Sequence, residues 1–541
     1  MSEQNFDVAI IGAGHNGLVC AAYLLKAGFR VLLLEKRPVP GGAATTEELL
    51  PETAPGFRFN RCAIDHEFIF LGPVIQELGL QNWGLEYLFP DPSVFCPQPN
   101  GDYFLAHRSL ERTCEDIARY SAADARQYQA FIQHWQGLLK AIQPLFNVPP
   151  QDILEIIGAY DWERLQAVWR LAGSKNKALD FIRTMLNSPE DVLNEWFDCE
   201  QVKAPLARLA SEIGAPPSQK GAASGMMMVA MRHQTGIARP RGGTGALTQA
   251  LVNLVQSLGG KILTEQRVKR ILVEDGRAVG VETATHVYRA SQGVIANVDA
   301  RRVFLDLLDP GAVPPLRRRL ERRIVNNNES LLKIDCALAG LPTFSSAQGK
   351  PELLQGTILI ADSLRHVEEA HALAQMGQIP DRNPSLYLDI PTLLDPSMAP
   401  EGKHTLWIEF FAPYEIAGAE GTGLAGTGWT TELKERVADR VIAKLADYAP
   451  DLPGLIIDRH VESPAELGER LGAYRGNYYH LDMTLDQMMF LRPLPEIANY
   501  QTPVQNLYLT GAGAHPGGSI SGMPGRNCAR VFLKQQRRWR F

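Results

Sequence analysis

The stretch DVAIIGAGHNGLVCAAYLLKAGFRVLLLE, residues 7–35, decides the fold. Its first part, Asp7–Ile11, has the apolar composition of a buried parallel strand, and Val31–Leu34 predicts a second strand of the same kind. Between them, apolar positions at helical spacing from Leu18 onward predict a helix, which Gly28 is suited to end because glycine is favoured just past a helix C-terminus. A strand, a glycine-rich turn, a helix and a second strand in this order are typical of a Rossmann unit.

The turn has the G-x-G-x-x-G spacing of a dinucleotide-binding loop. Gly12 permits the tight turn, Gly14 lets the backbone approach a pyrophosphate, and Gly17 allows close packing of the helix on the strand. Free N–H groups and a partial positive charge at the helix N-terminus favour bound phosphates, so we expect Ala13 and Asn16 to contact the ligand as well. The alternative is a glycine-rich turn in another kind of α/β protein.

Glu35 ends the second strand, 18 positions after Gly17. A carboxylate there accepts hydrogen bonds from ribose hydroxyls and repels a 2′-phosphate, which disfavours NADP. Lys36 follows, and then the pair Gly41 and Gly42. With this pair, the N-terminus resembles the extended fingerprint of the glutathione-reductase-like flavoproteins. That resemblance implies FAD as the cofactor, with these residues close to it.

Two later segments are expected to return to the same domain. The first starts with RPRGGTGAL, residues 239–247, and leads into a helix and then strands at Lys261–Thr264, Val268–Glu274 and Ala278–Thr283. In the flavoprotein class that the N-terminus resembles, a strand here presents backbone groups to the adenine. Val268 is therefore a candidate contact, or else a plain core valine.

The second return lies near residue 510. A strand at Asn506–Leu509 precedes a glycine-rich run, and a helix is predicted at Asn527–Gln535. Such a loop offers a second cradle of N–H groups, and no strand with an acidic residue follows that would make it a separate NAD site. Three residues of the loop are candidate cofactor contacts, although the histidine is equally well a loop residue: Gly511, Gly513 and His515.

These segments predict an α/β fold with a discontinuous, glutathione-reductase-like FAD-binding Rossmann domain and a mixed α+β substrate domain. The Rossmann domain would comprise residues 1–70, 230–310 and 495–541. The substrate domain would comprise residues 71–229 and 311–494, with a largely helical part at 110–225. Helical spacing in 162–172 and 178–186 supports that part, and strands are expected at 386–390 and 405–411.

Composition narrows the class of protein. The formal net charge of −6 argues against nucleic-acid binding, which usually needs a basic excess. Seven scattered cysteines form no C-x-x-C pair, so we expect no thiol–disulfide redox centre and a reducing compartment. The twelve histidines show no spacing typical of a metal site, and we expect none. The first strand starts too early to leave room for a signal peptide.

With these pieces placed, the chain resembles the bacterial-type phytoene desaturase family, which includes carotenoid isomerases, and within it the desaturase-like β-carotene ketolases of cyanobacteria. The resemblance spans essentially the whole chain. Where desaturases commonly have Phe-Asp-x-Gly-Pro, this chain has FNRCA at 59–63, which argues against simple phytoene desaturation. The resemblance is carried by FNRCAIDHEF (59–68), GMMM (225–228), VNNNE (325–329), YHLDM (479–483), DQMMFLRP (486–493) and residues 511–526.

The resemblance implies an FAD enzyme that acts on a long apolar polyene, and the subtype implies oxidation of β-carotene at ring carbon 4 to echinenone and then canthaxanthin. We hypothesise that hydride leaves the allylic ring methylene for the flavin, after which water or an oxygen species adds. Quinone or oxygen would be the final electron acceptor. Two alternatives stay open: a carotenoid desaturase or cis–trans isomerase on the same scaffold, and a flavin- or carotenoid-binding protein without turnover.

Few residues are marked as catalytic. Asp65, His66 and Glu67 form a polar cluster before an apolar run, and beside the flavin this cluster would handle a proton, since histidine titrates near neutral pH. A hydrogen-bonded structural cluster is the alternative. His480 would line the pocket or pack in the core.

Two basic groups would bring the protein to a membrane surface, where a polyene dissolves. Basic and aromatic residues together favour an anionic interface, and a solvated helix face is the alternative. A cytoplasmic protein in peripheral contact with the thylakoid or plasma membrane is therefore expected. The two groups are the tail KQQRRWRF, residues 534–541, and Arg317, Arg318, Arg319, Arg322 and Arg323.

Overall fold

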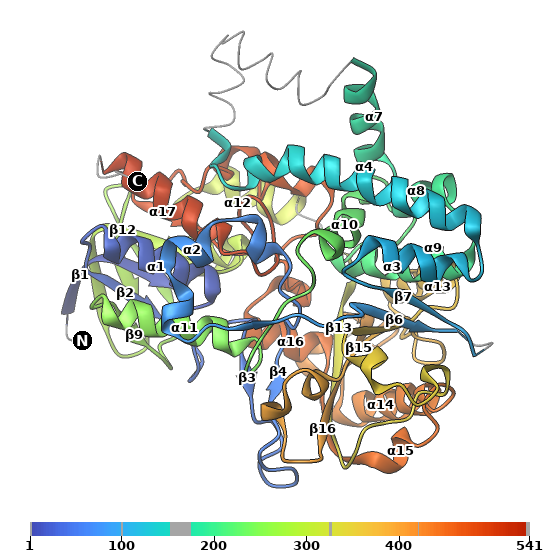
Figure 1. Cartoon of the computed structure of the whole chain (residues 1–541). Coiled ribbons are helices and arrows are strands. Elements are labelled where there is room, and N and C mark those ends of the chain that lie inside the picture. Colours follow the sequence, from blue (N-terminus) through green and yellow to red (C-terminus); the bar gives the residue numbers. More distant parts are fainter. Residues whose placement is uncertain (1–2, 99–100, 152–174, 324–326, 420, 537–541) are drawn as a thin grey trace.

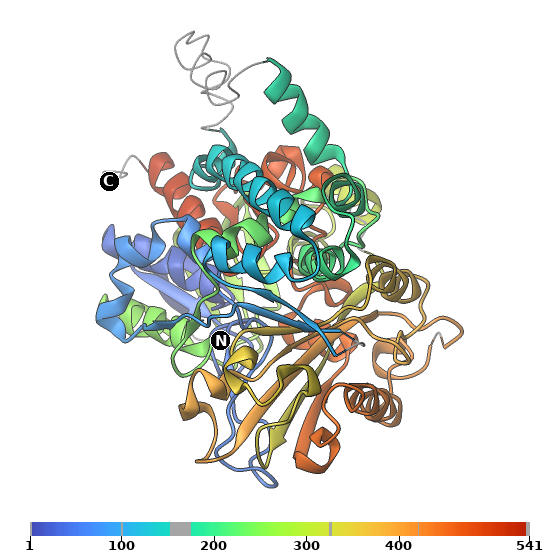
Figure 2. The ribbon, with the colours of Figure 1, turned by 45° about the vertical axis from the view of Figure 1, so that its right-hand side comes forward.

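Two seven-stranded sheets, each covered by helices, make up most of the protein (Figures 1 and 2). The coordinates are those of a computed structural model, which describes residues 3–98, 101–151, 175–323, 327–419 and 421–536. The sheet that contains the N-terminal strand forms one side of the molecule in Figure 1, and the second sheet lies beside it, below a layer of helices.

The first sheet contains the predicted Rossmann unit. Its central strand β1 (Glu3–Ile11) pairs in parallel with β2 (Val31–Leu34) and with β12 (Val287–Ala296). Strands from three distant stretches of the chain thus make one sheet, as expected of a discontinuous Rossmann fold, while the exact domain boundaries stay a prediction. The remaining strands are β9 (Lys261–Leu263) and β18 (Leu507–Leu509), both parallel to their neighbours, and the antiparallel hairpin β10 (Arg270–Glu274) and β11 (Arg277–Glu282).

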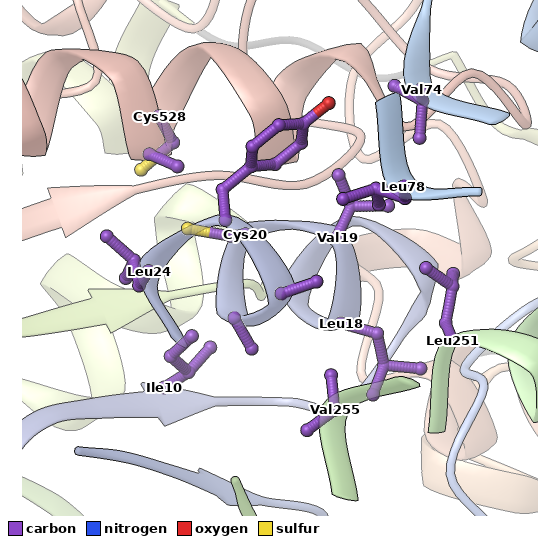
Figure 3. Close-up of a cluster of buried hydrophobic side chains, with 14 of the residues drawn as sticks. Ile10, Leu18, Val19, Cys20, Leu24, Val74, Leu78, Leu251, Val255 and Cys528 are labelled. Carbon is purple, nitrogen blue, oxygen red and sulfur yellow. The ribbon is translucent and has the colours of Figure 1, made fainter. Parts of the chain in front are cut away.

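Alternate residues of β1 face two different cores, which is why the strand is apolar throughout. Val8 and Ile10 pack against three helices on one face, and Ala9 and Ile11 pack on the other. Figure 3 shows Ile10 below α1 and Cys528 of α17 above it. The three helices are α1 (His15–Lys26), α11 (Gly245–Ser257) and α17 (Met523–Gln535).

The second sheet is almost entirely antiparallel, in the order β17-β13-β16-β15-β14-β6-β7. One face packs on a group of helices and the other on α14, so its central strands are also buried on both sides. The strands are β6 (Val94–Pro97), β7 (Tyr103–Ala106), β13 (Glu329–Leu338), β14 (Thr357–Ile360), β15 (Leu386–Asp389), β16 (His404–Pro413) and β17 (Ile456–Glu462).

Most of the other helices cover the second sheet or bridge the two sheets. In both views α7 projects from the molecule (Figures 1 and 2). These other helices are α2 (Val74–Leu78), α3 (Leu110–Ala118), α4 (Ala122–Phe146), α7 (Lys175–Leu186), α8 (Pro189–Trp196), α9 (Glu200–Ala210), α10 (Met226–Gln234), α12 (Pro314–Arg323), α13 (Leu364–Gln375), α14 (Thr431–Leu445), α15 (Leu452–Leu455) and α16 (Pro464–Leu471). The described residues also form two short ribbons, β3 (Thr46–Glu47) with β4 (Phe59–Asn60) and β5 (Tyr87–Leu88) with β8 (Arg239–Pro240).

Element boundaries differ from the predictions at a few places. The strand expected from Val268 starts at Arg270, and the helix expected from Asn527 starts at Met523, with Pro524 in its first turn. Proline is tolerated there because the first N–H groups of a helix have no internal partner. The helical pattern at 178–186 falls in α7, whereas that at 162–172 lies outside the described residues.

The two basic groups expected at a membrane surface are the arginines of α12 and the C-terminal tail. No helix within the described residues is long and apolar enough to span a bilayer. In α12, Arg317 Nη1 donates to the carbonyls of Phe304 and Leu305 at 3.1 and 3.0 Å, and Arg319 pairs with Glu496 at 2.5 Å. These two arginines therefore tie α12 to the protein itself. Residues 537–541 of the tail lie outside the described part of the chain.

Candidate active site

The glycine loop is packed too tightly for side chains. A Cβ on Gly17 would lie 2.4 Å from the Gly12 carbonyl oxygen and 2.7 Å from Asn297 Nδ2. Gly12 has a φ of +90°, which disfavours other residues. Its carbonyl accepts a hydrogen bond of 3.1 Å from Asn297 Nδ2. The loop is thus held between α1 and the end of β12, with the N-terminus of α1 at the ligand side.

Glu35 is buried at the end of β2, and two backbone groups orient its carboxylate. Oε2 accepts the N–H of Ala13 and Oε1 accepts the N–H of Arg37, both at 3.0 Å. The Gly41 N–H donates to the Ala13 carbonyl at 2.9 Å, which joins the glycine pair to the same loop. Two backbone N–H groups thereby fix the carboxylate beside the loop.

One cavity of about 1180 Å³ joins this loop to the second sheet. It is lined by loop residues such as Gly14 and Asn16, and also by Tyr387 of β15 and by Trp407 and Glu409 of β16. Small-molecule sites usually occupy roughly 300–1,000 Å³. The cavity therefore has room for a dinucleotide and for part of a substrate beside it.

Most of the predicted site residues converge on this cavity. Those that line it are Gly12, Gly14, Asn16, Glu35, Lys36, Gly42, Asp65, Val268 and His480. Val268 does so from the segment between β9 and β10, so it is not part of a strand as expected. The others lie behind the lining: Ala13, Gly17, Gly41, His66, Gly511, Gly513 and His515.

The two histidines behind the lining are held by other partners. His66 is fully buried, with Nδ1 3.0 Å from the Tyr87 hydroxyl and Nε2 2.7 Å from the Thr244 hydroxyl. His515 is also buried, and its Nε2 donates to the Leu145 carbonyl at 3.0 Å. Burial lowers the pKa of His66 to about 3 and that of His515 to about 4, so both rings stay neutral. Their geometry matches the structural alternative better than a role at the cofactor.

A buried ionic network lies between the loop and the second sheet. Arg239 Nε donates to Asp65 Oδ1 at 2.7 Å, and Arg239 also pairs with Asp389. The Tyr387 hydroxyl donates to Asp65 Oδ2 at 2.5 Å. Burial would raise the pKa of Asp65, but the charges of Arg239 and Arg232 hold it below its ordinary value. Asp65 is therefore an ionised, fully engaged anchor.

Glu67 is held less completely. Its Oε1 lies 3.0 Å from Arg232 Nε, and among the described residues Oε2 has no hydrogen-bond partner. Burial raises the pKa of Glu67 to about 7, opposed by the charge of Arg232 and assisted by those of Asp65 and Glu212. The side chain is nearly inaccessible to solvent but lines the cavity.

Two more carboxyl groups and a set of aromatic rings line the part of the cavity next to the second sheet. Glu212 pairs with the fully buried Arg208. Burial and the charge of Glu212 raise the pKa of Glu409 well above its ordinary value, which favours the neutral form of this carboxyl group. The hydroxyls of Tyr478 and Tyr479 both donate to the Glu212 carbonyl at 3.1 Å, and their rings are 4.3 Å apart.

Basic side chains gather on the other part of the lining, near Glu35. Burial and the charge of Arg267 lower the pKa of Lys36 to about 8, and its Nζ donates to the Glu469 carbonyl at 2.7 Å. Arg301 and Arg302, which follow β12, line the same cavity. No local pattern marked these arginines, because they approach the loop only through the return of the chain to the first sheet.

The fold and the cavity define a dinucleotide-binding protein of the Rossmann type. A family model described as an NAD(P)-binding Rossmann-like domain matches residues 10–65. The chain is 32% identical over 563 residues to pyridine nucleotide-disulfide oxidoreductase domain-containing protein 2 of Rattus norvegicus, covering 98% of this chain and 94% of that protein. The chain therefore belongs to the phytoene desaturase-like family of oxidoreductases that contains this protein.

Other relatives span the chain as fully. One component of the limonene dehydrogenase of Castellaniella defragrans is 28% identical over 99% of this chain and 96% of its own length. The lycopene-forming phytoene desaturase of Pantoea ananas is 26% identical over 97% of this chain and 98% of its own. A putrescine oxidase variant superposes with a TM-score of 0.63 at 15% identity, covering 99% of this chain and 100% of that one, which shows a shared fold.

Proposed function

We propose that this protein is an FAD-dependent carotenoid oxidoreductase that oxidises β-carotene at ring carbon 4, giving echinenone and then canthaxanthin. The observation that carries the proposal is the cavity that joins the dinucleotide loop to the second sheet. Because cofactor and substrate would share one space, an electron pair could pass directly between them. Limonene and phytoene, named in two full-length relatives, are both unsaturated hydrocarbons, which supports a terpenoid substrate.

The residues present fit a flavin adenine dinucleotide. The space that a Cβ on Gly17 would need is already filled, which keeps the loop backbone at the start of α1 and its N–H groups available to phosphates. The oriented carboxylate of Glu35 would accept hydrogen bonds from the adenosine ribose. Lys36, Arg301 and Arg302 supply positive charge along the same lining, which suits a diphosphate.

When bound, the flavin would supply the acceptor for a hydride. The protein's own task is then to orient one allylic methylene and to limit water. Tyr387, Trp407, Tyr478 and Tyr479 offer aromatic faces along the lining, and such faces suit a conjugated polyene and stabilise positive charge developing on it. After hydride loss, water would add at the oxidised carbon, and a second oxidation would give the ketone, with quinone or oxygen as final acceptor.

Product analysis tests the proposal directly. The gene is expressed in cells that accumulate β-carotene, and carotenoids are separated by chromatography. Echinenone and canthaxanthin should appear, and should be absent when Glu35→Ala is expressed at the same level. Purified protein is also incubated with β-carotene, phytoene or poly-cis lycopene. New double bonds or isomers, without keto products, would instead support the desaturase or isomerase alternative, and binding without turnover would support a carrier.

A further inference from the structure

Oxidation of a hydrocarbon releases protons as well as hydride. The cavity contains several carboxyl groups, which differ in the hydrogen bonds and ion pairs that they make. We propose that Glu67 is the catalytic base that takes the proton released from the substrate. This inference rests on the proposed function, since it names the residue that completes the same reaction.

One C–H bond of the substrate would break, and its electron pair would leave as hydride, for which a bound flavin would be the acceptor. Water then forms a C–O bond at the resulting cation, one of its O–H bonds breaks, and the proton passes to an oxygen of Glu67, which changes from carboxylate to carboxyl. If a double bond forms instead, the proton comes from the neighbouring carbon and has the same destination.

The geometry separates Glu67 from the neighbouring carboxyl group, Asp65. Asp65 uses both oxygens, since Oδ1 accepts from Arg239 and Oδ2 accepts from Tyr387 and from the Thr357 hydroxyl at 3.0 Å. Among the described residues, Glu67 has a single ion pair, with Arg232, and neither of its carboxylate oxygens has a hydrogen-bond partner. A carboxylate that is already saturated by donors is a weak base, whereas one with an available oxygen can accept a proton.

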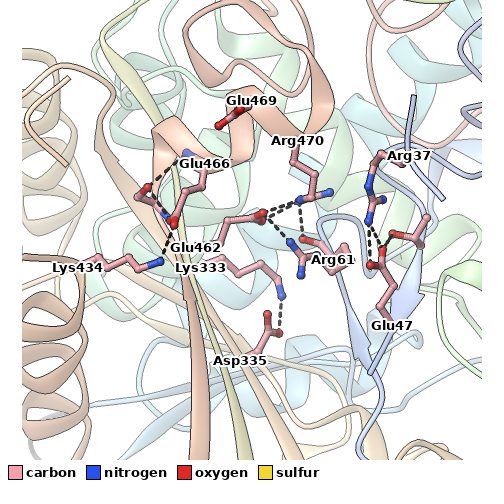
Figure 4. Close-up of polar contacts among 12 residues, drawn as sticks. Arg37, Glu47, Arg61, Lys333, Asp335, Lys434, Glu462, Glu466, Glu469 and Arg470 are labelled. Carbon is pink, nitrogen blue, oxygen red and sulfur yellow. Dashed lines mark hydrogen bonds and ion pairs between the residues drawn. The ribbon is translucent and has the colours of Figure 1, made fainter. Parts of the chain in front are cut away.

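The two carboxyl groups of the lining next to the second sheet, Glu212 and Glu409, are less suitable. Glu212 is paired with Arg208, whose guanidinium is fully buried and lies 5.6 Å from the Tyr387 ring centroid. Glu409 Oε2 also has no hydrogen-bond partner among the described residues, but burial and the charge of Glu212 raise the pKa of Glu409 well above its ordinary value, and the neutral form that this favours is a poor proton acceptor. Of the nearby cations, Lys333 pairs with Asp335, and Arg61 and Arg470 both pair with Glu462, so each of them already has a carboxylate partner (Figure 4).

The surrounding charges also place the pKa of Glu67 near neutral pH. Arg232 of α10 favours its charged form, while Asp65 on its own segment and Glu212, which follows α9, oppose that form. The Tyr387 hydroxyl on β15 accepts a hydrogen bond of 3.3 Å from Arg232 Nη2, so it fixes the arginine. A base that titrates near the working pH can accept a proton in one cycle and release it in the next.

The test compares flavin-loaded, full-length Glu67→Gln, Glu67→Asp and the parent protein, with β-carotene in detergent micelles. Glu67→Gln should lower kcat about 100-fold or more, while flavin content and KM change less than about threefold. The kcat of the parent should fall as the pH drops below about 7, this limb should vanish in Glu67→Gln, and Glu67→Asp should recover part of the rate.

Glu329→Gln is the matched control. Glu329 is a buried glutamate of β13 whose Oε2 lies 2.5 Å from His371 Nδ1, and it is absent from the cavity lining. Its variant should keep the pH profile of the parent. The proposal would be overturned if Glu67→Gln kept the kcat of the parent or the fall of kcat below about pH 7. It would also be overturned if Glu409→Gln, and not Glu67→Gln, lowered kcat.

A second readout needs neither flavin nor substrate. In infrared titrations of the cofactor-free proteins, the difference spectrum between the parent and Glu67→Gln should show one buried carboxyl band, which disappears as the pH rises through about 7. If the parent turns over none of the carotenoids, the proposed function fails, and the titration still decides this inference. The absence of this band from the difference spectrum, or a difference band that never titrates between pH 5 and 9, would contradict it.

Discussion

Replacing Gly17 by alanine tests the packing of the dinucleotide loop most sharply. The new Cβ would lie 2.4 Å from a backbone oxygen and 2.7 Å from an amide nitrogen, and neither the loop nor Asn297 can move freely, because they are hydrogen-bonded to each other. Overpacking of this kind costs about 1–3 kcal/mol. For a domain of ordinary size, each kcal/mol lowers Tm by roughly 2–4 °C, so Tm should fall by about 2–12 °C.

The same substitution should weaken cofactor binding, because relief of the clash moves the N-terminus of α1 away from its place beside the loop. A displacement that costs 1.4 kcal/mol of binding lowers affinity about tenfold. The assay measures Tm by circular dichroism and Kd for FAD by fluorescence quenching of the cofactor-free protein. Gly137→Ala is the control, since Gly137 is an exposed position of α4 with open space around it, and alanine there should be neutral or stabilising by up to about 1 kcal/mol. A Gly17→Ala protein with the Tm and Kd of the parent would refute the reasoning.

Three further predictions follow from buried charges. Glu35→Gln removes the charged acceptor of two backbone hydrogen bonds, and should weaken FAD binding by about 10–100-fold, measured by fluorescence titration; an unchanged Kd would contradict the assigned role. Arg239→Met leaves Asp65 and Asp389 buried without their shared cation, and should lower the free energy of unfolding by about 3–5 kcal/mol in urea, whereas a loss under 1 kcal/mol would not fit. The pKa of Glu67, raised in the folded protein from 4.5 to about 7, means that ionisation is penalised by folding. This penalty is absent below the pKa of the unfolded chain and complete above the pKa of the folded protein. The free energy of unfolding of Glu67→Gln, relative to that of the parent, should therefore rise by about 3 kcal/mol between pH 4.5 and 7.5. A difference in stability that does not change with pH would contradict this prediction.

The first sheet was predictable from the sequence because its information is local. The loop at 12–17, the helix after it and Glu35 lie within one βαβ unit, and each has a physical reason to occur at its spacing. The strands at 386–390 and 405–411 were found as β15 and β16, since turn residues bound them. Strand β13 was missed because all ten of its residues are buried, which leaves no alternation of apolar and polar positions to detect.

The polar part of the cavity could not be predicted in the same way. Arg239 meets Asp65 and Asp389 across 174 and 150 positions of sequence, so no local spacing reports the network. The cluster at 65–67 was recognised, but its three side chains point to different partners, and only the structure shows that His66 faces Tyr87 and Thr244. Side-chain direction in a segment without regular secondary structure depends on tertiary packing, which the pattern of residue types does not contain.

The proposed function requires that the loop and Glu35 bind an adenine flavin in the cavity shared with the second sheet. The most direct measurement is the visible absorption spectrum and flavin content of the purified protein, before and after incubation with FAD. We predict a yellow protein that holds about one FAD per chain, and a Gly17→Ala variant that holds much less under the same conditions. A colourless parent protein that takes up no FAD would contradict the account.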